Sequence, residues 1–127
     1  MKNKYLLSLL WVIVSGFGIL MAQEIAIIPQ PAQLIVKNES FKFGKQLKVC
    51  IASYRGDSVT LVFDSFKDDF QKATGIKVTS VRSEAKAGIV LSVNQTLAPE
   101  AYKLDVSPKQ IRIEAARPAG FYYALQT

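Results

Sequence analysis

The sequence contains no histidine and only one cysteine. Without an imidazole, the chain cannot use Ser-His or Cys-His catalysis, and it lacks the ligand found in most zinc and copper sites. The single cysteine, Cys50, excludes an internal disulfide. It lies in the apolar run 47–52, which predicts a buried strand, and no nearby group would lower its pKa. We therefore interpret Cys50 as a structural thiol and not as a nucleophile.

Phosphate-binding and metal-binding motifs are also missing. The sequence has no glycine-rich phosphate loop, no nucleophile elbow and no cluster with metal-ligand spacing, so we expect no cofactor and no metal. Its 16 lysines and arginines exceed its 10 acidic residues, which gives a formal charge of +6. This charge is spread along the chain without interleaved aromatic residues, which argues against nucleic-acid binding. We interpret it as an ordinary basic surface, with weak attraction to polyanionic glycans as the alternative.

The first 22 residues have the pattern of a secretory signal peptide. Lys2 and Lys4 make the start basic, residues 5–21 are apolar apart from two serines and two glycines, and Ala22 is a small residue at the expected cut. We therefore divide the chain into a signal peptide, residues 1–22, and one domain, residues 23–127, that is secreted or periplasmic. An uncleaved membrane anchor is the alternative, because the apolar run is near the lower length limit for spanning a bilayer.

The domain begins with a segment that cannot be a central strand. Pro29 and Pro31 lie close together, and each removes a backbone N–H and holds the chain extended, so we interpret this segment as a strap. Residues 33–37 and 41–43 follow, separated by a polar turn. Their composition predicts a small hairpin or a pair of edge strands.

The middle of the domain alternates strands with one helix. Apolar patterns predict strands over 47–53, 76–81 and 88–93, and the last is apolar enough to be covered on both faces. A helix is predicted over 59–74, with Gly75 placed to end it. Its single apolar stripe is formed by Val59, Val62, Phe63, Phe66, Phe70 and Ala73.

The last part of the chain predicts a hairpin and a second helix. Residues 102–106 and 111–115 each alternate apolar and charged side chains, as half-buried strands do. Pro118 suits the first position of a helix, which the sequence enters about two turns before its last residue. We therefore expect the front part of a longer protein. The fold class predicted is α+β: a mostly antiparallel or mixed sheet with two helices packed on one face.

Carboxylates are the remaining candidates for acid–base chemistry. Asp68 and Asp69 fall on the wet side of the predicted helix, and we interpret them as a solvated face. Asp105 and Glu114 point away from the apolar faces of the hairpin, where they are candidates for a glycosidase pair. Cross-strand ion pairing explains them better, because two basic residues share these outward faces, Lys103 and Arg112.

Two other patterns have a possible function. Residues 38–40 and 94–96 match the N-glycosylation tripeptide, and both fall in predicted loops. Tyr122 and Tyr123 form a potential platform for stacking on sugars, although tyrosines at the start of a helix are more often packing residues. We assign no catalytic, substrate-binding or metal-binding residue.

Several segments of the domain resemble the amino-terminal domain of beta-N-acetylhexosaminidases, glycoside hydrolase family 20. They are Ile-Pro-Gln-Pro at 28–31, Ile-Val-Leu at 89–91, Glu-Ala-Tyr-Lys-Leu at 100–104, Ile-Arg-Ile at 111–113 and Ala-Gly-Phe-Tyr-Tyr-Ala-Leu-Gln-Thr at 119–127. The resemblance extends from about residue 25 to the last residue.

This resemblance implies an α+β domain joined in cis to a (β/α)8 barrel that performs the chemistry. In the family, an adjacent Asp-Glu pair on the barrel acts with the acetamido group of the substrate to release terminal N-acetyl-hexosamines. No residue of this chain matches the motif of that pair, so the resemblance implies an accessory domain that is inactive alone. The alternatives are a stand-alone secreted module that binds carbohydrate or another partner, and the front domain of another glycosidase family.

Overall fold

The computed structural model describes residues 31–52 and 57–127. The predicted signal peptide and the start of the strap lie outside these ranges, as does position 53 of the first long strand. Within the described ranges, no helix is both long and apolar enough to cross a bilayer.

The centre of the fold is one sheet of five strands in the order β2-β1-β3-β5-β4. Its strands are β1 (Gln46–Ala52), β2 (Lys77–Ser80), β3 (Ile89–Val93), β4 (Tyr102–Val106) and β5 (Ile111–Ala115). β1 is parallel to β2 and to β3, and β3 is parallel to β5, whereas β4 is antiparallel to β5. The prediction of a mixed sheet is confirmed. The alternative of a mostly antiparallel sheet is wrong, because β3 pairs with β5 and not with β4, the next strand in the chain.

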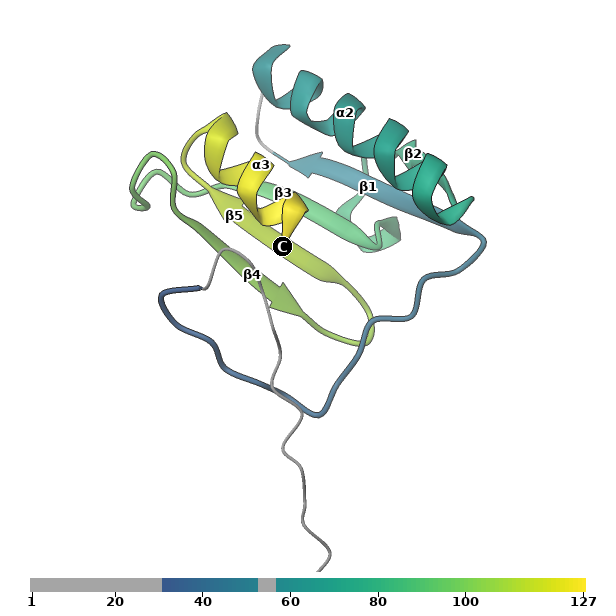
Figure 1. Ribbon diagram of the computed structural model, residues 1–127, viewed down its shortest axis with the longest axis horizontal. Helices are drawn as coiled ribbons and strands as arrows, with labels where there is room; N and C mark the ends of the chain where they lie inside the picture. Colours follow the sequence, from purple (N-terminus) through teal and green to yellow (C-terminus); the bar gives the residue numbers. More distant parts are fainter. Residues whose placement is uncertain (1–30, 53–56) are drawn as a thin grey trace, which may run out of the picture. The chain divides into compact units, whose positions relative to one another are not determined.

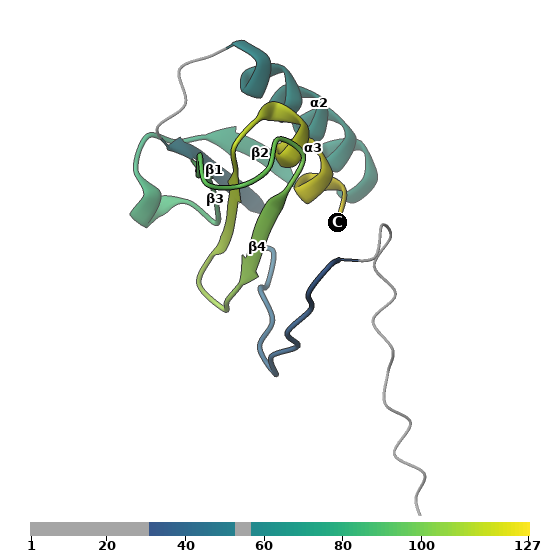
Figure 2. The same cartoon turned by 90° about the vertical axis from the view of Figure 1, so that its left-hand side faces the viewer.

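Two helices cover one face of this sheet (Figures 1 and 2). α2 (Asp57–Thr74) connects β1 to β2, and this helical crossover allows the two strands to be parallel. Gly75 ends α2 with a φ of 72°, and its N–H donates to the Gln71 carbonyl. α3 (Pro118–Gln126) begins at the proline that the sequence indicates, after β5, and packs beside α2. Both predicted helices, and the face they share, are confirmed.

The main core lies between the helices and the sheet. Alternate strand residues supply one side of it, and α3 together with the predicted stripe of α2 supplies the other, except for Ala73, which is exposed. Its buried members are Leu47, Val49, Val59, Phe63, Val78, Ile89, Leu91, Ile113, Ala115, Phe121 and Ala124. Each large side chain stabilises the fold by about 1.5–3 kcal/mol relative to its exposed state, before ordering entropy is counted.

The opposite face of the sheet has a smaller apolar cluster. Cys50 and Val90 lie side by side in β1 and β3 and are buried together with Ala87, beside the short helix η1 (Glu84–Lys86). β3 is therefore covered on both faces at its centre, as its nearly continuous apolar sequence predicts. The predicted burial of Cys50 is confirmed.

The prediction of a small hairpin or a pair of edge strands over 33–37 and 41–43 is wrong. Neither segment belongs to a strand of the described chain, so residues 31–45 form one irregular segment that continues the strap. Side chains hold the second segment in place instead: Phe41 packs against the main core, and the Phe43 ring lies 5.4 Å from the ring of Phe70 in α2. The contacts of Phe41 and Phe43 with the core and with α2, and not pairing in a sheet, explain the apolar pattern of this segment.

Candidate functional site

The hairpin carboxylates that were candidates for a catalytic pair are engaged in separate contacts. The register places Lys103 opposite Glu114 and Asp105 opposite Arg112, as cross-strand pairing requires. The salt bridges nevertheless form with other elements. Asp105 Oδ1 lies 2.8 Å from the Nζ atom of Lys37 in the strap. The prediction of cross-strand ion pairs is therefore wrong, although the four residues do share one face.

Arg112 and Glu114 likewise turn toward neighbouring segments. Arg112 Nη2 lies 3.2 Å from Glu84 Oε2 in η1, so this contact ties β5 to the cover of the smaller cluster. Glu114 Oε2 accepts a hydrogen bond of 2.8 Å from Asn94 Nδ2. Because each candidate carboxylate is held by a different donor, the hairpin presents no pair poised for acid–base catalysis.

The salt bridge between the strap and β4 changes one pKa. The hydrogen bond to Asp105, reinforced by the negative charge of that carboxylate, raises the pKa of Lys37 above its ordinary value of 10.5. Both side chains are exposed by more than half. The contact positions the strap beside the edge of the sheet and leaves Lys37 fully charged at neutral pH.

The other candidate carboxylates lie on the surface of α2. Asp68 and Asp69 are exposed on α2, which confirms that they belong to a solvated face. Across residues 31–52 and 57–127, no three acidic or cysteine side chains come together in a way that would hold a metal ion.

Residues 94–96, one of the two glycosylation tripeptides, form a closed polar turn. Asn94 Oδ1 accepts hydrogen bonds from the N–H of Thr96 (3.1 Å) and from its Oγ1 (2.6 Å), while Asn94 Nδ2 donates to Glu114. The amide that a glycan would occupy is thus already used in the fold. Asn38, in the other tripeptide, is exposed, and its modification stays a prediction.

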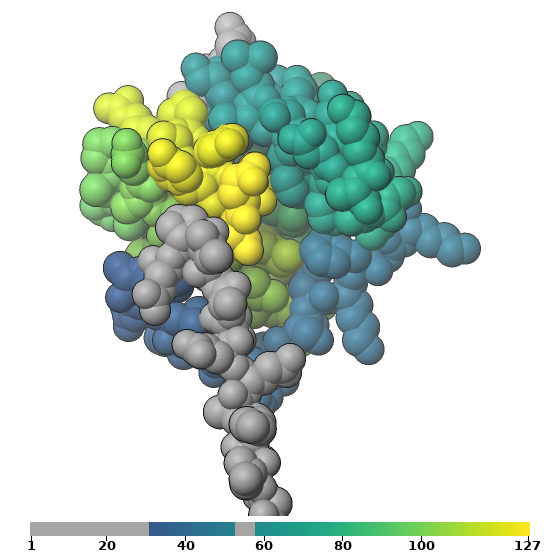
Figure 3. Space-filling model, in the orientation of Figure 1, coloured from purple at the N-terminus to yellow at the C-terminus, as the bar shows by residue number. Residues whose placement is uncertain are grey.

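Tyr122 and Tyr123 lie on the outer surface of α3 and are 46% and 37% exposed. Their rings are 5.7 Å apart and inclined by 69°, a geometry that gives no single flat platform for a sugar. Both tyrosines lie outside the main core of the described chain. Leu61 on α2 is exposed as well. Figure 3 shows α2 in teal and α3 in yellow next to each other on one face.

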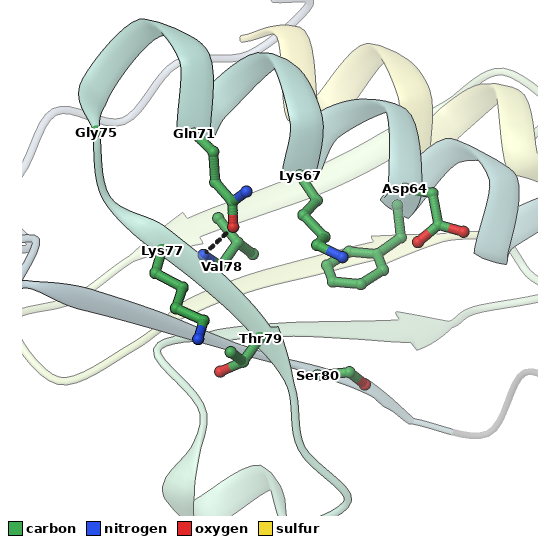
Figure 4. A pocket seen from close by; sticks show the side chains of 9 residues that line it. Asp64, Lys67, Gln71, Gly75, Lys77, Val78, Thr79 and Ser80 are labelled. Atoms are coloured by element: carbon green, nitrogen blue, oxygen red, sulfur yellow. Dashed lines mark hydrogen bonds between the residues drawn. The ribbon is translucent and has the colours of Figure 1, made fainter.

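A groove runs between α2 and the edge strand β2, with a volume of about 720 Å³. Figure 4 shows Lys67 and Gln71 reaching from α2 toward β2, where Gln71 Oε1 accepts a hydrogen bond of 2.7 Å from the N–H of Val78. The groove is lined by polar and charged side chains of both elements, among them Asp64, Lys67 and Lys77. The sequence did not predict this groove, because the groove depends on β2 being the outermost strand of the sheet.

The sequence matches the model of a known protein family. The sequence model of the family described as glycosyl hydrolase family 20, domain 2, matches residues 24–127. No curated protein matches the chain in sequence.

Solved structures of glycosidases share the architecture. A GH20 exo beta-N-acetylglucosaminidase from Vibrio harveyi, in complex with N-acetylglucosamine, is 30% identical, with a TM-score of 0.67 over 78% of this chain and 15% of that one. A beta-N-acetylhexosaminidase from Bacteroides fragilis is 23% identical, with a TM-score of 0.62 over 78% of this chain and 19% of that one. A chitobiase from Flavobacterium johnsoniae is 23% identical, with a TM-score of 0.65 over 78% of this chain and 17% of that one. The chain thus spans less than a fifth of the length of these enzymes.

Proposed function

The chain belongs to glycosyl hydrolase family 20, whose domain 2 it contains, and we propose that it is the accessory amino-terminal domain of a secreted beta-N-acetylhexosaminidase. The match over residues 24–127 is the observation that carries this proposal. The parent enzyme hydrolyses terminal N-acetyl-hexosamine residues from glycans, and a (β/α)8 barrel in cis supplies its catalytic groups.

The separate contacts of the carboxylates support a non-catalytic role. Asp105 and Glu114 are each held by a different donor, and Asp64 is the one carboxylate that lines the groove beside β2. The domain therefore acts by contact: it covers part of the barrel and supports its folding.

The face that meets the barrel is the outer helix face, defined by Leu61, Tyr122 and Tyr123. These side chains are apolar or aromatic and are exposed in this chain. Tyrosine is enriched in protein interfaces relative to the rest of the protein surface. The opposite face of the sheet carries charged residues in β4 and β5, which suits contact with water.

The proposed function also includes export of the protein from the cytoplasm. Residues 1–22 act as a cleaved signal peptide, and the domain from residue 23 onward enters the periplasm or the medium with its barrel.

Two measurements test the proposal. The reading frame beyond Thr127 should encode a barrel-length sequence with an adjacent Asp-Glu pair. The extended protein should hydrolyse p-nitrophenyl N-acetyl-β-glucosaminide, while the 127-residue chain should not. Hydrolysis by the short chain, or a reading frame without a barrel, would refute the proposal.

A stand-alone carbohydrate-binding module is the second candidate, because Tyr122 and Tyr123 form no common flat platform but each exposes part of a ring that a sugar can contact. Isothermal titration of the chain with chitobiose separates the two. Binding that is lost in the double variant Tyr122→Ser and Tyr123→Ser supports the module, and no heat of binding supports the accessory domain.

A further inference from the structure

No strand of the described residues pairs with the outer edge of β2. β2 is the outermost strand and pairs with β1 on one side. The N–H of Val81, just after β2, donates to the Val49 carbonyl in β1 at 2.8 Å. Because successive residues of a strand direct their backbone groups to opposite edges, Val78 and Ser80 direct theirs outward. Such an edge is a template for an added extended segment.

α2 converts this edge into one wall of a groove. The helix supplies four lining residues, Phe63, Asp64, Lys67 and Gln71, and β2 supplies the facing wall. The volume of about 720 Å³ lies within the range of roughly 300–1,000 Å³ that ligand clefts have. A segment that pairs with β2 would therefore also contact the side of a helix.

Gln71 occupies the place of a missing strand. Its Oε1 atom accepts the outward N–H of Val78 at 2.7 Å, as the carbonyl of a sixth strand would. A side-chain amide and a peptide group are the same kind of acceptor. Exchange of one for the other conserves the hydrogen bond, so displacement of Gln71 leaves no buried donor unpaired.

The charges of the groove select its occupant. Lys67 and Lys77 line it, and neither forms a salt bridge with another side chain of the described residues. Asp64 is the one carboxylate among the residues that line the groove. We propose that this groove binds an extended segment of a partner polypeptide, which adds to β2 as a sixth strand, displaces Gln71 Oε1 and places acidic side chains beside Lys67 on the helix side of the sheet and beside Lys77 on its other side.

An NMR titration of the ¹⁵N-labelled chain tests the proposal. The probes are two heptapeptides of alternating threonine and valine, one with a central glutamate and one with a central lysine. The glutamate peptide should shift the amide signals of Val78 and Ser80. The double variant Lys67→Glu and Lys77→Glu should weaken its binding at least ~10-fold and favour the lysine peptide.

Two further variants sharpen the test. Lys72→Glu is the matched control, because Lys72 is exposed on α2 outside the groove, and it should leave binding unchanged. Gln71→Ala frees the Val78 N–H and should tighten binding of the glutamate peptide. Unshifted β2 amides at millimolar peptide, equal binding of both peptides, or dimerisation of Gln71→Ala without peptide would each overturn the proposal. The last result would show that Gln71 guards the edge against a second copy of the chain.

Discussion

A Cβ atom on Gly120 would lie 2.6 Å from the carbonyl oxygen of Ala101 and 2.8 Å from the Cβ atom of Ala115. Glycine at this position lets α3 approach both the segment before β4 and the end of β5. The approach matters because α3 contributes Phe121 and Ala124 to the main core.

Gly120→Ala should therefore destabilise the fold, although alanine is the better helix former by about 1 kcal/mol. The neighbours on both sides are backbone and a short buried side chain, which cannot move away cheaply. We expect a net loss of about 1–3 kcal/mol in the free energy of unfolding, measured by urea denaturation.

Gly44→Ala is the matched control. The nearest atom to a Cβ there is 3.9 Å away, so this variant should change stability by less than about 0.5 kcal/mol. A Gly120→Ala protein as stable as the parent would mean that α3 does not pack as closely as described.

The closed turn around Asn94 gives a second prediction. Asn94→Ala removes the donor to Glu114 and both hydrogen bonds of the turn with Thr96. We expect a loss of about 1–2 kcal/mol in the free energy of unfolding. Gln95→Ala, at an exposed neighbour in the same turn, should have little effect. Equal effects of the two substitutions would contradict the role of this network.

The hairpin shows how far periodicity predicts the fold. The alternation of 102–106 and 111–115 assigned the buried and the outward faces correctly except at Val106, which is exposed at the end of β4, because period two depends on local geometry. The same residues did not predict which charges would meet. Asp105 pairs with Lys37 and Arg112 with Glu84, and both partners come from segments distant in sequence.

The strand order could not be predicted from the sequence either, because it also depends on contacts between segments that are distant in the chain. β3 is apolar on both faces whether its neighbours are parallel or antiparallel, so its composition could not show that it pairs with β5. The groove beside β2 depends on that order. At 33–37, strand-forming residues are present, but a strand also requires a partner ladder, and tertiary packing supplies none there.

The strap gives a prediction about alkaline pH. Since the pKa of Lys37 is raised in the folded state by Asp105, its stabilising contribution is present below the unfolded pKa of 10.5 and is lost as the pH rises through the higher folded value. The difference in stability between the parent and Lys37→Met should therefore be constant up to about pH 9 and shrink above pH 10.5.

Urea denaturation between pH 8 and pH 12 measures this difference. Lys45→Met is the control, because Lys45 is exposed and lies outside the salt bridges of the described residues. A difference for Lys37→Met that persists undiminished at the highest pH would show that the residue stabilises the strap by packing and not by its charge.

Cys50 reports on opening of the smaller cluster. Burial raises the pKa of its thiol above the ordinary value of 9.0, and the negative charge of Glu84 adds to this effect. Burial and the nearby negative charge both disfavour the reactive thiolate. The folded chain should react with a disulfide reagent such as DTNB on the order of 100-fold more slowly than the unfolded chain, since reaction requires the cluster to open.

Because Cys50 is the only cysteine, the absorbance change reads one position without further labelling. Arg112→Ala removes the salt bridge to Glu84 in η1, beside the cluster, and should accelerate the reaction. Lys109→Ala, at an exposed position of the adjoining turn, is the control. If Cys50 reacts equally fast in the folded and unfolded chain, the loop that carries Ala87 does not cover it. One face of the central strand β3 would then be exposed to solvent, and burial on both faces would not explain its apolar sequence.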